Sequence, residues 1–151
     1  MTRQTKKLTI LSADFAVGTY LTPQLLSMAK TLGYASVINT MPAPDSVLED
    51  IGANALANNA RNCGMEYHQF SVGNIGIISE DDIAGFQDLL DELPKPILAF
   101  SRTGLTATAL WAASMVDTMD WEEIVMSAER AGLDISFLIN SPAVPSLSKV
   151  A

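Results

Sequence analysis

The sequence predicts an α/β fold in which a mainly parallel central sheet carries helices on both faces. Short apolar runs alternate with segments of helical periodicity along the 151 residues, and this alternation is typical of parallel strands joined by crossover helices. Apolar residues make up 48% of the chain and charged residues 17%, which is a globular composition. A chain of this length forms one domain that buries about two thirds of its unfolded surface.

The first half of the chain supplies three strands and two helices. Short apolar runs predict the strands: 8–11, 15–17 and 35–39. Thr22 caps the first helix and Pro23 occupies its first turn, a combination that starts helices, and Gly33 ends it. The two prolines within 41–45 exclude a regular element there, so the second helix is expected at 46–62.

The second half of the chain supplies two strands and four helical segments. Strands are predicted at 65–72 and 97–100, and the latter is a fully apolar run, as expected of a central strand. A helix starts at Ser79, with Asp82 in its third helical position. The helical segments are 79–92, 107–116, 121–131 and a short last piece capped by Asp134.

The chain is strongly acidic away from its ends. Nine basic residues oppose 17 acidic ones, and four of the nine lie near the termini: Arg3, Lys6, Lys7 and Lys149. The five that remain leave a net charge of −12 between Leu8 and Ser148. The negative electrostatic field of this charge excludes general binding of nucleic acid or of an anionic membrane, because both require basic patches.

The termini and the few reactive side chains limit the kinds of site and the location that the protein can have. We expect residues 1–7 to form a basic extension, 8–140 the folded domain and 141–151 a flexible tail. Cys63 is the single cysteine and His68 the single histidine, which excludes an intramolecular disulfide, a cysteine-based zinc cluster and a multi-histidine metal site. The sequence contains no recognisable secretory signal or membrane span, so a cytoplasmic location is expected.

Ligands of a parallel sheet bind at the carboxyl ends of its strands. Two loops qualify, 101–106 after the strand at 97–100 and 40–45 after the strand at 35–39. The first has Gly104 at its fourth position and leads into a helix. Such a turn aims successive N–H groups and a helix N-terminus at one point, which makes an anion site. An ordinary strand-to-helix turn explains the same residues.

The surroundings of this turn resemble a known family. The run 96–111 is similar to the loop and helix of the bacterial tyrosine-phosphatase-like family, also found as the phosphatase-like domain of beta-lactamase-hydrolase-like proteins. The family's pattern is roughly Leu-Ala-Tyr-Cys-Arg-Ser/Thr-Gly-x-Arg, followed by an apolar helix carrying Leu-Trp. Tyr67-His68 and the run 131–136 extend the resemblance. It implies a tyrosine-phosphatase-like fold over 8–140 and an ancestry of phosphatase or sulfurtransferase chemistry.

The residues that carry the family's loop chemistry are replaced in this chain. Ser101 stands at the position of the nucleophilic cysteine and Thr106 at that of the loop arginine. The longer tyrosine-phosphatase spacing would place the arginine at Ala107, so neither spacing keeps it. A serine hydroxyl ionises far less readily than a loop cysteine and needs an adjacent base. Sulfur transfer also needs a sulfur atom at position 101.

The second loop has changed as well. Met41 and Ala43 stand where the family has arginine and aspartate, unless Asp45 has taken over the place of the aspartate. An engineered cysteine-to-serine change would explain Ser101 alone, so four replacements favour a natural relative that has abandoned the chemistry. Loss of the thiolate and the arginine together is expected to nearly abolish phosphoryl transfer.

Three functions remain open. The first is a catalytically inactive phosphatase-like domain that weakly binds a small oxyanion such as phosphate or sulfate, or a protein partner. The second is a weak phosphoric-ester hydrolase with Ser101 as nucleophile, assisted by His68 and Asp45. The third is an interaction domain whose loop is an empty relic. No cofactor or metal is expected. The predicted anion-binding loop consists of Ser101, Arg102, Thr103, Gly104, Leu105 and Thr106.

Overall fold

One five-stranded sheet organises the chain. The structure is a computed structural model that describes residues 8–19, 22–41, 47–72 and 78–145, with the backbone alone described for 47–53. The strands are β1 Leu8–Ser12, β2 Phe15–Thr19, β3 Ser36–Asn39, β4 Glu66–Gln69 and β5 Ile97–Ser101, and their order in the sheet is β1-β2-β5-β3-β4. The β1–β2 pair is antiparallel and the other three pairs are parallel, which confirms the predicted mainly parallel sheet.

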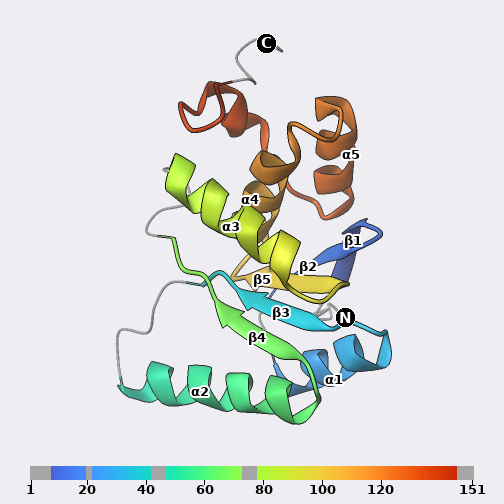
Figure 1. Cartoon of the computed structure of the whole chain (residues 1–151), viewed down its shortest axis with the longest axis vertical. Helices are drawn as coiled ribbons and strands as arrows, with labels where there is room; N and C mark the ends of the chain where they lie inside the picture. The colour runs from blue at the N-terminus through green and yellow to red at the C-terminus, as the bar shows by residue number, and fades with distance from the viewer. Residues whose placement is uncertain (1–7, 20–21, 42–46, 73–77, 146–151) are drawn as a thin grey trace, which may run out of the picture.

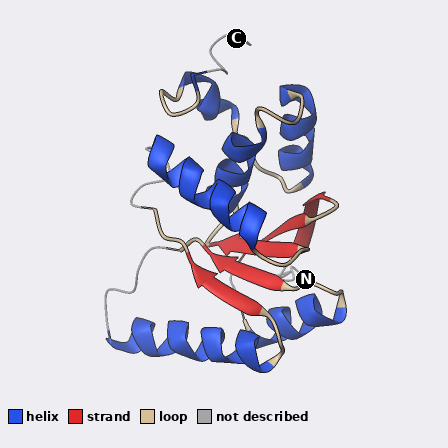
Figure 2. Ribbon diagram, in the orientation of Figure 1, coloured by secondary structure: helices blue, strands red, loops and turns tan. Residues whose placement is uncertain are grey.

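Helices cover both faces of the sheet, as the sequence predicts. They are α1 Pro23–Thr31, α2 Val47–Asn62, α3 Glu80–Glu92, α4 Leu105–Met115 and α5 Trp121–Arg130, followed by a 3-10 turn at Ser136–Asn140. Figure 1 and Figure 2 show α1 and α2 on one face and α3, α4 and α5 on the other. Among the described residues, no helix is both long and apolar enough to cross a membrane.

β5 is the central strand of the sheet. All five of its residues are buried, and it pairs with β2 on one side and β3 on the other. Ile97 and Ala99 enter the larger core beneath α3, α4 and α5. Leu98 and Phe100 enter the smaller core that α1 and α2 cover. The unbroken apolar run therefore reflects a strand buried on both faces.

Aromatic rings fill the larger core. Phe15 of β2 stacks on Trp111 of α4 with ring centroids 6.1 Å apart and an interplanar angle of 8°. It also meets Phe86 of α3 edge-on at 6.1 Å. Phe86 in turn contacts Phe70, which follows β4, at 5.7 Å. These contacts tie α3 and α4 to the sheet through one connected cluster.

Two helix starts predicted from the sequence are confirmed. The Thr22 hydroxyl accepts a hydrogen bond from the Leu25 N–H at 3.1 Å at the start of α1. The Ser79 hydroxyl accepts from the Asp82 N–H at 3.0 Å, while the Asp82 carboxylate accepts from the Ser79 N–H at 3.0 Å. This reciprocal pair is a complete capping box at the start of α3.

Several boundaries differ from the sequence prediction, and three of them bear on the packing and the site. β4 ends at Gln69 rather than at 72, although the Phe70 N–H still donates to the Asn39 carbonyl at 2.8 Å. α4 begins at Leu105, two residues before the expected start, since the left-handed residue Gly104 completes the turn. Val144 is buried in the larger core, so the packed body continues beyond the expected limit at residue 140.

Truncation of the central aromatic ring of the larger core will reveal how much this cluster stabilises the fold. Phe86 is fully buried, so Phe86→Ala is expected to lower the free energy of unfolding by about 3–5 kcal/mol. Phe137→Ala makes the same change at a side chain that is 37% exposed and is expected to cost about 1 kcal/mol or less. Urea titration followed by circular dichroism measures both, and equal losses would contradict the central place of Phe86.

Candidate functional site

The carboxyl ends of three parallel strands meet at one edge of the sheet. Ser101, the last residue of β5, lies opposite Thr19 of β2. Phe100 lies opposite Asn39, the last residue of β3. The Thr40 N–H and its hydroxyl both donate to the Phe100 carbonyl at 2.9 Å. The loop that follows β5 therefore starts from a fixed position at the centre of the edge where α/β folds bind ligands.

The loop reverses direction in very few residues. Gly104 is the N-cap of α4 and has φ of 87° and ψ of −11°, in the left-handed region, which glycine adopts without strain. The Thr103 hydroxyl accepts from the Leu105 N–H at 3.3 Å. The Gly104 carbonyl accepts the first helical bond from the Thr108 N–H at 3.0 Å. The sequence expectation of a tight glycine turn leading into a helix is thus met.

The turn leaves several backbone donors available. Among the described residues, the N–H groups of Arg102, Thr103, Gly104 and Thr106 have no acceptor. They lie at the N-terminus of α4, where the helix dipole adds partial positive charge. A set of unpaired N–H groups next to a helix N-terminus is the arrangement that binds oxyanions in proteins.

The Ser101 hydroxyl lies beneath this turn. Only 4% of Ser101 is exposed, and its oxygen accepts a hydrogen bond from the Ala107 N–H at 3.5 Å. Within the described part of the chain, no carboxylate or imidazole bonds to this hydroxyl. A serine nucleophile needs such a base, so the described contacts give Ser101 no activation.

His68, one of the other two residues proposed for catalysis, lies away from Ser101. Ile38 of β3 is in register with both His68 and Ala99, so two strand spacings of about 4.8 Å each separate His68 from β5. The partner of His68 is Glu66, whose Oε1 lies 3.6 Å from the imidazole Nε2. Asp45 lies outside the described residues. The catalytic roles of these residues stay predictions.

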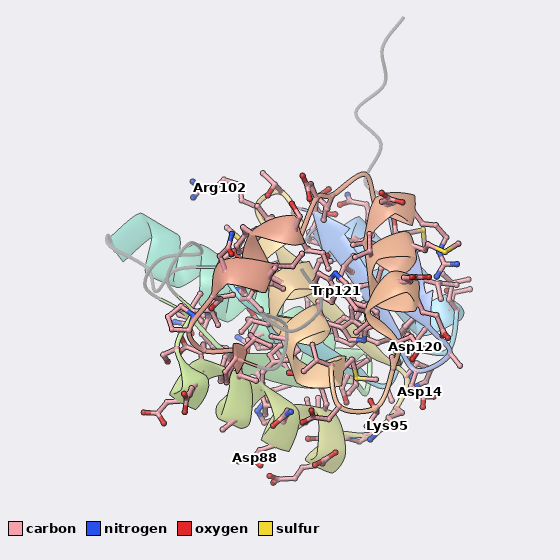
Figure 3. The ribbon with its side chains drawn as sticks, turned by 90° about the horizontal axis from the view of Figure 1, so that it is seen from above. Asp14, Asp88, Lys95, Arg102, Asp120 and Trp121 are labelled. Carbon is pink, nitrogen blue, oxygen red and sulfur yellow. The ribbon has the colours of Figure 1, made fainter. Side chains whose placement is uncertain are left out.

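Neither candidate position of the family's loop arginine carries a positive charge in this chain. Thr106 is partly exposed and Ala107 is buried, and neither carries charge. Arg102 is exposed, and Figure 3 shows its side chain pointing away from the body of the molecule. The loop therefore offers backbone dipoles, without a guanidinium directed at their focus. Among the described residues, no three histidine, cysteine, aspartate or glutamate side chains come together to form a metal site.

A hydrogen-bonded clamp beside the loop is not evident from the sequence. The Asn39 side chain donates to the Tyr67 hydroxyl at 2.9 Å and accepts from the Met41 N–H at 2.8 Å. The Met41 carbonyl accepts from Gln69 and from Ser71, each at 2.7 Å. These bonds fix the chain where it leaves β3. The signal in the sequence is the asparagine that ends an apolar strand, a position that requires a polar partner.

The surroundings of the Tyr67 phenol shift its pKa. Burial raises the pKa of Tyr67, although the Asn39 amide donor and the Arg61 charge act to lower it. The phenol therefore stays neutral over the physiological range and keeps a proton to donate.

Comparison with known proteins agrees with this geometry. The family described as beta-lactamase hydrolase-like protein, phosphatase-like domain, matches residues 7–118. No curated protein matches the chain in sequence. A candidate phosphatase from Neisseria meningitidis has a similar structure, with a TM-score of 0.73 and 21% identity over 95% of this chain and 97% of that one.

Two further solved structures share the fold. A candidate phosphatase from Shewanella putrefaciens has a TM-score of 0.64 and 16% identity over 96% of this chain and 90% of that one. TpbA of P. aeruginosa, solved as a cysteine-to-serine variant in complex with pTyr, has a TM-score of 0.62 and 10% identity over 95% of this chain and 88% of that one. At these identities the likeness shows the tyrosine-phosphatase-like fold.

The left-handed turn at Gly104 predicts a defined cost for any side chain there. A Cβ at Gly104 would make ordinary contacts of 3.5 Å with Leu133 and Thr19, so the penalty of Gly104→Ala comes from its backbone, about 1–2 kcal/mol. Gly33→Ala is the matched control, because Gly33 also has a positive φ and open space around it. Chemical unfolding is expected to show similar losses in both variants. If Gly33→Ala lost stability but Gly104→Ala did not, the left-handed turn at Gly104 would be contradicted.

Proposed function

Because the chain belongs to the family of phosphatase-like domains of beta-lactamase hydrolase-like proteins, we propose that it is a catalytically inactive member that binds a small oxyanion at loop 101–106. The anion is phosphate or sulfate, either free or carried by a protein partner. The observation that supports this proposal best is the Gly104 turn, after which several N–H groups at the N-terminus of α4 have no acceptor among the described residues.

Backbone groups alone give the proposed site its affinity. The donors of residues 102–106 need no particular side chain to form an anion nest. The neighbouring α4 is anchored in the core, since its residues 107–114 are all buried. The geometry is therefore set before any ligand arrives, which reduces the entropy cost of binding. The acidic body opposes anions at long range, but contact with N–H dipoles outweighs a screened field at short distance.

Inactivity follows from what the loop lacks. A loop thiolate would supply the nucleophile, and an arginine would stabilise the charge of the transition state through two parallel hydrogen bonds. Ser101 and Thr106 supply neither. The buried Ser101 hydroxyl accepts from a backbone N–H and contacts no described base, which argues against the weak hydrolase.

Binding of sulfate tests the proposed site directly. We expect sulfate to shift the amide resonances of residues 102–106 in a ¹⁵N-labelled sample, with millimolar or weaker affinity because no guanidinium contributes. Chloride at matched ionic strength is the control for general salt effects. Gly104→Ala is expected to weaken the response and Gly33→Ala to leave it unchanged. If residues 101–106 show no sulfate-specific shifts in the native protein, the loop is an empty relic.

Restoring the missing groups tests the lost chemistry. The native protein is expected to turn over no p-nitrophenyl phosphate, whereas the double variant Ser101→Cys with Thr106→Arg is expected to regain slow turnover. The cysteine would be ionised by the loop N–H groups and the new guanidinium, and each single variant should stay inactive because the two groups act on one transition state. A double variant with an ordinary thiol pKa of about 8.5 and no turnover would show that loop 101–106 lacks the geometry that binds an anion. Native turnover that disappears in Ser101→Ala would instead establish the hydrolase.

A further inference from the structure

The outer edge of β4 presents backbone groups that no described residue pairs with. β4 is the last strand of the sheet and pairs with β3 alone. The N–H groups of Glu66 and Phe70 donate inward to Ala35 and Asn39. Since direction alternates along a strand, the intervening Tyr67 directs its N–H and C=O groups outward, and Gln69 does the same. No strand among the described residues meets this side, and an open edge is a template for another strand.

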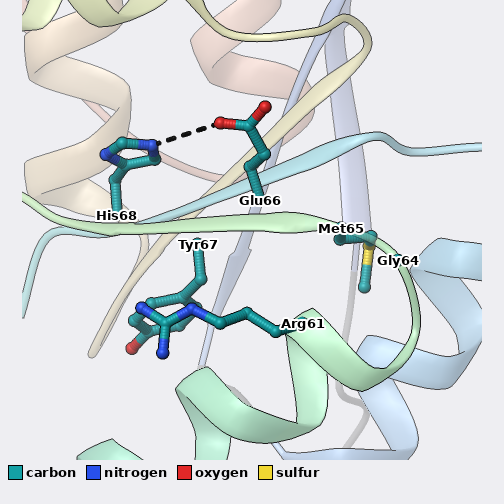
Figure 4. A pocket seen from close by; sticks show the side chains of 6 residues that line it. All are labelled: Arg61, Gly64, Met65, Glu66, Tyr67 and His68. Carbon is teal, nitrogen blue, oxygen red and sulfur yellow. Dashed lines mark ion pairs between the residues drawn. The ribbon is translucent and has the colours of Figure 1, made fainter.

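A groove runs along this edge. Its volume is about 460 Å³, and its lining residues are Arg61, Gly64, Met65, Glu66, Tyr67 and His68. Figure 4 shows Glu66 and His68 on one side of the strand, with Tyr67 and Arg61 on the other. The side chains of His68 and Glu66 are 41% and 56% exposed and lie 3.6 Å apart. An acidic and an imidazole side chain thus stand next to each other on one face of an open strand.

We propose that two copies of the chain associate through this edge, with β4 antiparallel to β4 and the two-fold axis passing at Tyr67. In this register, Tyr67 exchanges both backbone hydrogen bonds with Tyr67 of the second copy. Gln69 N–H groups donate to the Met65 carbonyls across the axis. Glu66 lies directly opposite His68 of the second copy, once on each side of the axis. The two sheets become one continuous ten-stranded sheet, twice the five strands of the single chain.

The side chains select this register over its neighbours. A shift of two residues in one direction places Glu66 opposite Glu66, and directly opposed like charges are destabilising. The shift in the other direction places His68 opposite His68 and Glu66 opposite Phe70. The register centred on Tyr67 places a carboxylate opposite an imidazole in both non-hydrogen-bonded pairs, where facing Cα atoms are only about 4.5 Å apart. The imidazole serves as partner in either protonation state, because its neutral form keeps one N–H donor.

The association is expected to be weak. β4 has four residues, and short charged edge strands resist random pairing. The two copies each carry a net charge of −8, which adds repulsion. An interface built on so short an edge falls below about 1,200 Å², at the weak end of specific association. We expect a dissociation constant of about 100 μM.

Two variants with complementary charges at positions 66 and 68 test both the dimer and its register. In sedimentation velocity, the native protein is expected to be a monomer at about 10 μM and mainly a dimer at about 1 mM. Glu66→Lys and His68→Glu are each expected to stay monomeric. The first replaces the carboxylate acceptor opposite His68 with a second donor group, and the second puts two carboxylates opposite each other. An equimolar mixture is expected to dimerise. In that mixture the introduced lysine faces the introduced glutamate, and the native His68 faces the native Glu66.

A matched control separates this register from general charge effects. Glu129→Lys makes the same change of charge at an exposed position of α5 and is expected to dimerise as the native protein does. Thermal unfolding confirms that every variant is folded. A native protein that stays monomeric at about 1 mM overturns the proposal. So do single variants that keep the native affinity, or a mixture that stays monomeric.

Discussion

The turn from β5 into α4 is the constraint on which the rest of the structure depends. β5 is buried along all its residues, and α4 is buried without interruption from Ala107 to Ser114. The chain must therefore pass from the centre of the sheet to the centre of the helical layer within residues 102–104. A left-handed glycine at 104 makes this reversal where a residue with a Cβ would be strained.

The sizes of its buried side chains set the position of α4 more than polar contacts do. The fully buried alanines of this helix allow it to lie close to the sheet: Ala107, Ala109 and Ala112. Trp111 then fills the space over Phe15. The hydroxyls of Thr108 and Ser114 are buried without a partner among the described residues, a cost that apolar packing must offset. The geometry of loop 101–106 follows from this packing and does not require the side chains of residues 101 and 106 to be reactive.

The elements were predictable from the sequence because their signals are local. The apolar run at β5, the Thr22 cap and the capping box at Ser79 each depend on neighbours within a few residues. The clamp of Asn39 on Tyr67 was not predictable, since it depends on the register between β3 and β4. The position of the loop was predictable from the end of an apolar strand and Gly104. Its unpaired N–H groups were not, because their freedom depends on where the neighbouring carbonyls point.

His68 shows how position in the sheet limits the role that a residue can have. As the single histidine of the sequence it is the obvious base for Ser101, but strand order places it at the outer edge, with two strand spacings between it and β5. A side chain there faces the groove and Glu66, and it would have to cross the width of β3 to reach the loop. The two proposals therefore concern separate edges of the sheet. The proposed anion site uses backbone dipoles at the carboxyl edge, and the proposed dimer uses backbone pairing with complementary side chains at the β4 edge.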